Sequence, residues 1–409
     1  MTSVGPLHST RLYYRPTPLL REVVAACSAL ARPFRPTPWA VNRHLQLALL
    51  AFADGHDLPL RYERCTVLRL GDGGCVSLEW SGLDADPATP TVVVLPTVCG
   101  DGQSMRRLVR DLRAHLGWRI VVCNRRGHGT LPLTTPRFSV LGSVADLRVQ
   151  LAEIRRQVPE SPLYGVGVSA GSGLLVRALG EDGDATPFTA AIASCPGYDT
   201  TRAFGRVHRP YDRYLTRMLK AHFLERHADV LRGHAGYAEG LTSRTVQEFQ
   251  DHCHPLAGFG SMADYHAATN PMAVAERIRV PLLVLNAADD PVCVVENVLE
   301  HLGLVDVLAE SLIALTSRGS HCAFFEGTRR PGSWAHRVIA QYLRAVDDAL
   351  RPRPRASGSL RKAGGLRGRN RGEYPFHEDG LSTANRAQVR FSSCGALLGA
   401  TKKSACFRP

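Results

Sequence analysis

The stretch from Leu163 to Val176 reads LYGVGVSAGSGLLV and changes pattern in its middle. Its first six residues are an apolar run of the kind that forms a strand buried on both faces, and the Leu-Leu-Val at its end indicates a helix. Between them lies Gly167-Val168-Ser169-Ala170-Gly171, a G-x-S-x-G motif. A sharp turn there would strain the serine backbone and expose its hydroxyl, while the glycines let other backbone pass close by. The motif predicts a nucleophile at Ser169; the alternative is a glycine-rich turn without chemistry.

Strand and helix patterns alternate on both sides of this motif. A hairpin pattern precedes a β-branched run, and the later strands are separated by segments with apolar residues three and four positions apart. Because parallel strands need helical crossovers, this order predicts an α/β fold with a mostly parallel sheet covered by helices on both faces. The expected strands span residues 64–70, 75–80, 91–95, 119–124, 163–168, 189–194, 281–285 and 311–315.

Two loops after the last two expected strands supply partners for a serine nucleophile. His321 follows the last strand, and the pair Asp289 and Asp290 follows the one before it. The carboxyl ends of parallel strands meet at one edge of a sheet, and serine, acid, histidine is the chain order of a hydrolase sheet. We predict that His321 is the base and that Asp290, directly before Pro291, orients it. Asp289 stays open as the alternative acid; it could instead cap the next helix or orient its neighbour.

An oxyanion hole would complete such a site. One donor would be the backbone N–H of Ala170, directly after the serine. The other would come from the loop after the strand 91–95, which reads PTVCGDG. Thr97 or Val98 is the expected second donor, and the glycines suit a loop that turns back over the site.

Further segments carry a resemblance to a known family. They are PTPW at 36–39, NRHLQ at 42–46, NRRGHG at 124–129, LGE at 179–181 and FEG at 325–327. With the serine motif, the Asp-Asp-Pro loop and the late histidine, the chain resembles the α/β-hydrolases. More narrowly it resembles abhydrolase family four, which includes relatives of bacterial short-chain esterases and animal α/β-hydrolase-domain phospholipases. The resemblance implies an eight-stranded sheet, a Ser169–Asp290–His321 triad, ester, phospholipid or monoacylglycerol substrates, membrane association and no cofactor.

Departures from the family pattern keep a second function open. A glycine-rich P-G-x-x-G loop is usual where this chain has Pro96-Thr97-Val98-Cys99-Gly100, so the Thr97 side chain could crowd the oxyanion pocket. Ala170 stands where the family commonly has Leu or Met. The two hypotheses are therefore a serine carboxylester or lipid hydrolase, and a regulatory or scaffolding protein at membranes that keeps the triad.

A long segment without a strand pattern separates the strands 189–194 and 281–285. An insertion at about 197–279, after the carboxyl end of a strand, is expected to cover the site as a helical lid. The alternative is a packed helix pair unrelated to substrate. One helical face is expected to border an acyl pocket with Tyr211, Leu215, Met218 and Phe223, and the other to meet solvent or a phosphate with Arg206, Arg209, Arg213 and Arg217.

Charge is distributed unevenly along the chain. The 409 residues carry a net charge of +13, of which residues 351–409 contribute +10 through 13 Lys or Arg and 3 Asp or Glu. This basic, glycine-rich tail is predicted to be disordered. The remainder carries only +3, so we do not expect nucleic acid as a partner. Three parts are expected: an N-terminal extension (1–60), a hydrolase domain (61–350) and the tail (351–409).

Eleven cysteines without a C-x-x-C spacing predict reduced thiols rather than a disulfide framework. His252-Cys253-His254 has no second ligand pair at a finger-like spacing, so no metal is expected. No apolar run approaches the roughly 20 residues of a spanning helix. We expect a cytoplasmic protein or one peripheral on intracellular membranes, with an unknown protein partner. The bias toward arginine over acidic residues in 1–32 is compatible with an organelle transit peptide.

Overall fold

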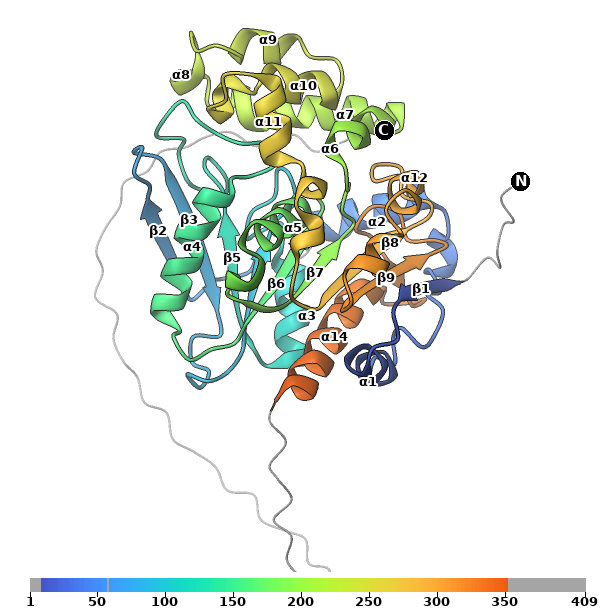
Figure 1. Ribbon diagram of the computed structural model, residues 1–409. Helices are drawn as coiled ribbons and strands as arrows, with labels where there is room; N and C mark the ends of the chain where they lie inside the picture. Colours follow the sequence, from blue (N-terminus) through green and yellow to red (C-terminus); the bar gives the residue numbers. More distant parts are fainter. Residues whose placement is uncertain (1–8, 57–58, 352–409) are drawn as a thin grey trace, which may run out of the picture. The chain divides into compact units, whose positions relative to one another are not determined.

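The computed structural model describes residues 9–56 and 59–351, with one large sheet at the centre (Figure 1). The sheet has nine strands in the order β1-β9-β8-β7-β6-β4-β5-β3-β2. Pairing is parallel from β5 through β4, β6, β7 and β8 to β9, and antiparallel at both edges. The strands are β1 (Thr10–Tyr14), β2 (Arg64–Arg69), β3 (Cys75–Ser81), β4 (Thr91–Leu95), β5 (Arg119–Asn124), β6 (Leu163–Val168), β7 (Phe188–Ser194), β8 (Leu282–Ala287) and β9 (Ser311–Thr316).

The central strands are short apolar runs, and helices cover both of their faces. Every residue of β4, β5 and β6 is buried, and alternate side chains enter different cores. Val92 and Val94 of β4 join one apolar cluster, whereas Val93 and Leu95 join the other. The α/β fold with helices on both faces is therefore confirmed. The first cluster includes α1 (Pro18–Ala26), α3 (Arg106–Leu116) and α14 (Trp334–Leu350), and the second includes α4 (Val144–Gln157) and α5 (Ala170–Asp182).

The sheet has nine strands, so the expectation of eight is wrong by one. The additional strand is β1, which pairs antiparallel with β9 along its whole length. It comes from residues 1–60, the segment set apart above as an N-terminal extension. The helix that follows, α1, begins after Thr17, whose hydroxyl accepts a hydrogen bond from the Leu20 N–H, and it buries Leu20 and Val23 completely. This segment therefore contributes to the main core, which its arginine- and proline-rich sequence did not predict.

The insertion between β7 and β8 is helical and lies over one end of the sheet (Figure 1). It has its own apolar cluster, in which Phe223 and Phe249 pack together with Phe138 and Val140 from the segment after β5. The rings of Phe138 and Phe223 stack with centroids 4.8 Å apart, so the insertion is anchored to the sheet domain. Its elements are α6 (Thr200–Ala203), α7 (Arg209–Leu219), a π-helical segment (Lys220–Glu225), α8 (Ala228–Leu231), α9 (Tyr237–Thr242), α10 (Val246–His252) and α11 (Met262–Thr269).

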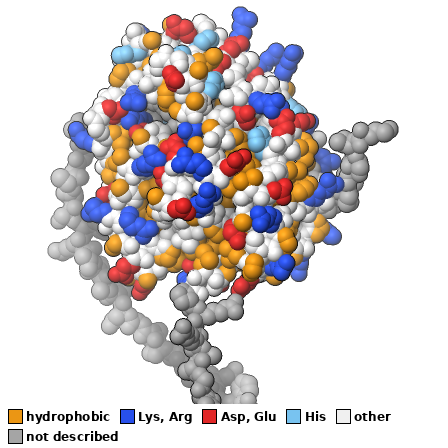
Figure 2. Space-filling model, in the orientation of Figure 1, with side chains coloured by type: hydrophobic (Ala, Val, Ile, Leu, Met, Phe, Trp, Pro, Cys, Tyr) orange, Lys and Arg blue, Asp and Glu red, His pale blue; other side chains and the backbone are white. Residues whose placement is uncertain are grey.

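The remaining elements are short, apart from one surface helix. They are α2 (Arg43–His56), α12 (Val295–Leu299), α13 (Leu304–Val307) and the two-stranded ribbon β10 (Phe325–Glu326) and β11 (Gly332–Ser333). Basic and acidic side chains are interspersed over the face seen in Figure 2. Within residues 9–56 and 59–351, no helix combines the length and apolar character that crossing a membrane requires. The predicted disordered tail lies outside the described residues, except for Arg351.

Candidate active site

Ser169 lies in the tight turn between β6 and α5. Its backbone angles, φ 53° and ψ −118°, are rare for a residue with a side chain. The turn is held because the Ser169 N–H donates to the Ser194 carbonyl at 2.8 Å. Both motif glycines are needed here: a Cβ at Gly167 would lie 2.5 Å from the Gly171 carbonyl oxygen, and one at Gly171 would overlap the Leu95 carbonyl. The glycines therefore allow the chain to fold back tightly on itself and present the serine.

The structure brings His321 and Asp290 to this serine. Ser169 Oγ lies 2.9 Å from His321 Nε2, and His321 Nδ1 lies 2.8 Å from Asp290 Oδ2. The Asp290 carboxylate has no exposed surface. Its Oδ1 accepts hydrogen bonds from the backbone N–H groups of Val292 and Cys293, at 2.7 and 2.9 Å. These bonds keep the buried carboxylate in place and leave its other oxygen to the imidazole.

Asp289 has a different position. Its Oδ1 accepts a hydrogen bond from the Ser320 N–H at 2.9 Å, and Arg318 lies 3.9 Å from its Oδ2. Burial raises the pKa of this carboxyl group. Asp289 thus holds the loop that carries His321, while Asp290 contacts the ring itself.

The environment of His321 favours its protonated form. Burial opposes a charge on the ring and by itself lowers the pKa of His321. The adjacent Asp290 carboxylate and the Cys293 side chain together outweigh this effect, so the pKa of His321 is raised well above its usual range. An imidazole of this kind accepts a proton readily and is stabilised once charged.

The loop after β4 is held by two buried side chains that sequence reasoning did not single out. Arg125 Nη2 donates to the carbonyls of Thr97 and Val98, the latter at 2.8 Å, and His128 Nε2 lies 3.1 Å from the Val98 carbonyl. Burial lowers the pKa of Arg125 to about 10, so the guanidinium stays charged at neutral pH. By fixing these carbonyls the two side chains fix the peptide planes of the loop. The only signal in the sequence was their place in the NRRGHG segment.

The Thr97 side chain lies against Gly100. A Cβ at Gly100 would come within 2.5 Å of Thr97 Oγ1, which shows how closely the two residues pack. Among the described residues that line the cavity at Ser169, the loop contributes Val98 and not Thr97. The Thr97 hydroxyl thus packs on Gly100 within its own loop.

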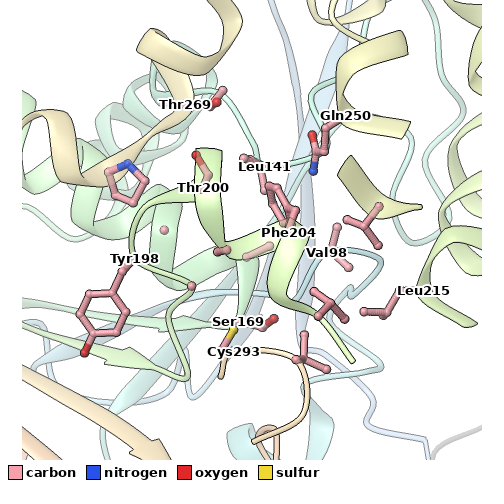
Figure 3. Close-up of a pocket in the computed structure, with 18 of the residues that line it drawn as sticks. Val98, Leu141, Ser169, Tyr198, Thr200, Phe204, Leu215, Gln250, Thr269 and Cys293 are labelled. Carbon is pink, nitrogen blue, oxygen red and sulfur yellow. The ribbon is translucent and has the colours of Figure 1, made fainter. Parts of the chain in front are cut away.

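A narrow, mainly apolar cavity of about 100 Å³ opens at Ser169 and His321 (Figure 3). Ala170, the first expected oxyanion donor, also borders it, as does Val98, one of the two candidates for the second donor. Figure 3 shows Phe204 and Leu215 of the insertion on the same cavity. The insertion supplies Tyr198, Thr200, Ala203, Phe204, Val207, Leu215, Leu219, Val246, Gln250 and Thr269.

The prediction of which helical face borders this cavity is only partly correct. Leu215 and, one turn later, Leu219 line it, whereas Phe223 is buried in the core of the insertion itself. Eight residues separate Phe223 from Leu215, which is more than two full α-helical turns, and the helix becomes π-helical from Lys220 onward. Tyr211 instead contacts His44 of α2, both through its hydroxyl and by ring stacking.

The four arginines predicted to lie on the opposite helical face fall into two groups. Arg206 forms an ion pair with Glu300 at 2.7 Å and donates to Asn297 at 2.8 Å, so its charge is already compensated within the protein. The exposed members are Arg209, Arg213 and Arg217.

The family model for serine aminopeptidase S33 hydrolases matches residues 86–327, more than half of the 409-residue chain. The chain belongs to this α/β-hydrolase family. The predicted family is thus confirmed. The matched region of this α/β-hydrolase contains the serine turn, the Asp-Asp-Pro loop and His321.

Curated relatives match most of the chain. Human Protein ABHD15 is 29% identical over 380 residues, which cover 87% of this chain and 78% of the relative. Mouse Phospholipase ABHD3 is 27% identical, with 78% and 80% covered. Mouse Monoacylglycerol lipase ABHD2 is 24% identical, with 84% and 87% covered. Two of these names are those of lipid hydrolases, which is consistent with a carboxylester hydrolase.

Proposed function

We propose that this protein is a serine carboxylester hydrolase that acts on lipid or short acyl esters through a covalent acyl-enzyme. The observation that carries the proposal is the unbroken chain of contacts from Ser169 Oγ through His321 to Asp290 at an apolar cavity. Nucleophile, base and orienting acid are the three groups that acyl transfer to a serine requires.

Acylation follows from this geometry. Ser169 Oγ attacks the ester carbonyl carbon while its proton passes to His321 Nε2. Asp290 holds Nδ1–H and stabilises the imidazolium that forms. The oxyanion receives hydrogen bonds from the N–H groups of Ala170 and Val98. His321 then protonates the departing alcohol, and a water molecule, deprotonated by the same imidazole, releases the acid and restores the serine.

The cavity favours the acyl part of the substrate. Leu215, Leu219 and Val246 present hydrocarbon to it, with few polar neighbours. Its mainly apolar wall suits the hydrocarbon of an acyl chain better than a bulky polar group. The relatives' names add phospholipid and monoacylglycerol esters as the substrate classes to test first.

Three exposed apolar side chains support contact of this protein with a membrane. Trp39, Leu45 and Phe52, from the segment Pro38–His56, are 54%, 50% and 60% exposed. Trp39 Nε1 donates to the Thr328 carbonyl at 2.9 Å, which places the indole beside the exposed Arg329 and Arg330. Aromatic side chains next to basic ones match the interface of an anionic bilayer. Replacing Trp39 and Phe52 with Ser should reduce sedimentation with phosphatidylserine vesicles; unchanged sedimentation would contradict this contact.

The second hypothesis is a scaffolding protein that keeps the triad without turnover. It depended on Thr97 crowding the oxyanion pocket. Because Thr97 packs on Gly100 and does not line the cavity, the geometry favours the enzyme.

A fluorophosphonate probe and a series of p-nitrophenyl esters test the proposal. The purified protein should be labelled at Ser169 and should hydrolyse short or medium acyl esters. Ser169→Ala should abolish labelling and turnover, while Ser28→Ala, at an exposed serine, should change neither. A folded wild-type protein that takes no label and cleaves none of the esters would reject the enzyme and favour the scaffold.

A further inference from the structure

Three cysteines surround His321, although the proposed reaction uses none of their thiols. Cys195 follows β7, Cys322 follows His321, and Cys293 lies three residues after Asp290. The Sγ atoms of Cys195 and Cys322 and a ring nitrogen of His321 all lie within 4.8 Å of one another. The Cys322 N–H donates to Cys195 Sγ at 3.3 Å, which keeps the two residues together.

The thiols lie beside the Asp290 carboxylate, with Cys195 and Cys293 buried and Cys322 half-buried. Cys195 is fully buried. Contact with Cys195, together with burial and the nearby Asp290, raises the pKa of Cys322 well above its usual range. Burial raises the pKa of Cys293 to about 11. A divalent cation would relieve the repulsion that opposes thiolates beside a carboxylate.

We propose that Cys195, His321 and Cys322 bind a d¹⁰ divalent cation such as Zn²⁺ or Cd²⁺, with water as the fourth ligand. Two thiolates and an imidazole are a ligand set that these metals prefer over oxygen donors. Binding replaces the two thiol protons, which pass to solvent, by two metal–sulfur bonds, and no group changes its oxidation state.

The bound cation should inhibit the enzyme. Both ring nitrogens of His321 are engaged, Nε2 with Ser169 and Nδ1 with Asp290. A metal bond at either nitrogen therefore removes one contact of the proposed triad. This consequence rests on the proposed function, whereas the binding itself does not.

A second donor set overlaps with the first. Asp290, Cys293 and His321 also place one donor atom each within 4.8 Å of one another. However, both Asp290 oxygens already accept hydrogen bonds, from His321 on one side and from two backbone N–H groups on the other. The set with two thiols is the softer one, so we assign the site to Cys195, His321 and Cys322.

Cobalt binding to the full-length protein tests the assignment, because Co²⁺ in a thiolate site gives charge-transfer and d–d absorption. We expect titration with Co²⁺ in a thiol-free reductant to show one equivalent with these bands, which Zn²⁺ should abolish by displacement. Cys195→Ser and Cys322→Ser should each weaken binding at least about tenfold. Cys293→Ser and Cys65→Ser, the latter at an exposed thiol, should keep the bands. Circular dichroism establishes that each variant is folded.

The spectroscopic result is independent of turnover. Bands that persist in Cys195→Ser and Cys322→Ser, or that disappear only in Cys293→Ser, would overturn the assigned ligands. Absence of bands in an active enzyme would overturn the site and leave the proposed function intact. Bands in a protein without esterase activity would support the site and count against the proposed function. In an active protein, Zn²⁺ should inhibit the wild type at concentrations at least about tenfold below those needed for Cys195→Ser.

Discussion

The edge of the sheet and the helical insertion that covers it acquire their structures differently. At the sheet edge, Ser169 and Asp290 each follow a strand, so backbone pairing determines where they lie. The insertion has a separate core around Phe223 and Phe249, and only some of its side chains reach the cavity. The proposed chemistry therefore depends on the sheet, whereas the shape of the cavity depends on the insertion.

Buried polar side chains join the two regions. The ring of His128, next to the loop of Val98, packs on His222 of the insertion with centroids 4.5 Å apart and planes tilted by 59°. His227 Nε2 lies 3.2 Å from the Gly127 carbonyl. Desolvation lowers the pKa of both His128 and His222. Neutral histidines therefore hold the insertion against the proposed oxyanion loop.

The largest expected effect lies at the sheet edge. Ser169→Ala should lower kcat for a p-nitrophenyl ester by on the order of 10⁴ to 10⁶, because the only placed nucleophile is lost. The melting temperature should change little, since the substitution removes one hydroxyl and leaves the apolar core intact. Steady-state kinetics and a thermal melt measure both quantities. Undiminished turnover would show that the covalent step occurs elsewhere.

Substitutions of Arg125 test whether its hydrogen bonds to the loop after β4 orient the proposed oxyanion donors. Arg125→Ala should reduce kcat by on the order of 10², because the carbonyls of Thr97 and Val98 lose their donor and the loop amides lose their orientation. Arg125→Lys keeps the charge without the planar fork and should recover only part of the rate. A fall in melting temperature without a fall in kcat at a temperature where the variant is folded would make Arg125 structural only.

Substitutions in the insertion should alter which substrates are preferred rather than the chemical step. Leu215→Trp fills part of the cavity, so an octanoyl chain loses space for a few of its methylene groups. We expect kcat/KM for an octanoyl ester to fall about tenfold relative to that for an acetyl ester. Tyr214→Trp is the matched control, because Tyr214 is 53% exposed on the same helix. Equal effects on both esters would place the acyl chain outside this cavity.

The smallest expected effect is on the pH dependence of the free energy of unfolding, at the contact between the insertion and the sheet domain. Burial lowers the pKa of His222 from 6.5 to about 4 in the folded protein. Between these values the unfolded chain binds more protons, so stability falls as the pH is lowered from 6.5 to about 4, by up to about 1.4 kcal/mol for each pKa unit. His222→Gln should flatten this part of the pH dependence of urea unfolding, whereas His234→Gln, at an exposed position, should not. Identical curves for both variants and the wild type would exclude a role for His222.

Sequence alone determined the elements in which local pattern and final structure agree. Apolar runs such as Thr91–Leu95 predict buried strands because only the interior of a parallel sheet accepts them on both faces. The serine turn could also be recognised, because its glycines meet a steric demand created by residues close in the chain and by the strand beside it. The order of serine, acid and histidine then predicted which loops meet.

Tertiary structure alone decided what depends on distant packing. Strand β1 forms because it can pair with the edge of β9, and the pattern of residues in Thr10–Tyr14 does not predict that pairing. Packing within the insertion buries Phe223 in a separate core, and only the fold revealed that Arg125 and His128 hold the loop after β4. The cysteines around His321 follow three different strands, so their proximity is a property of the sheet edge rather than of any spacing in the sequence.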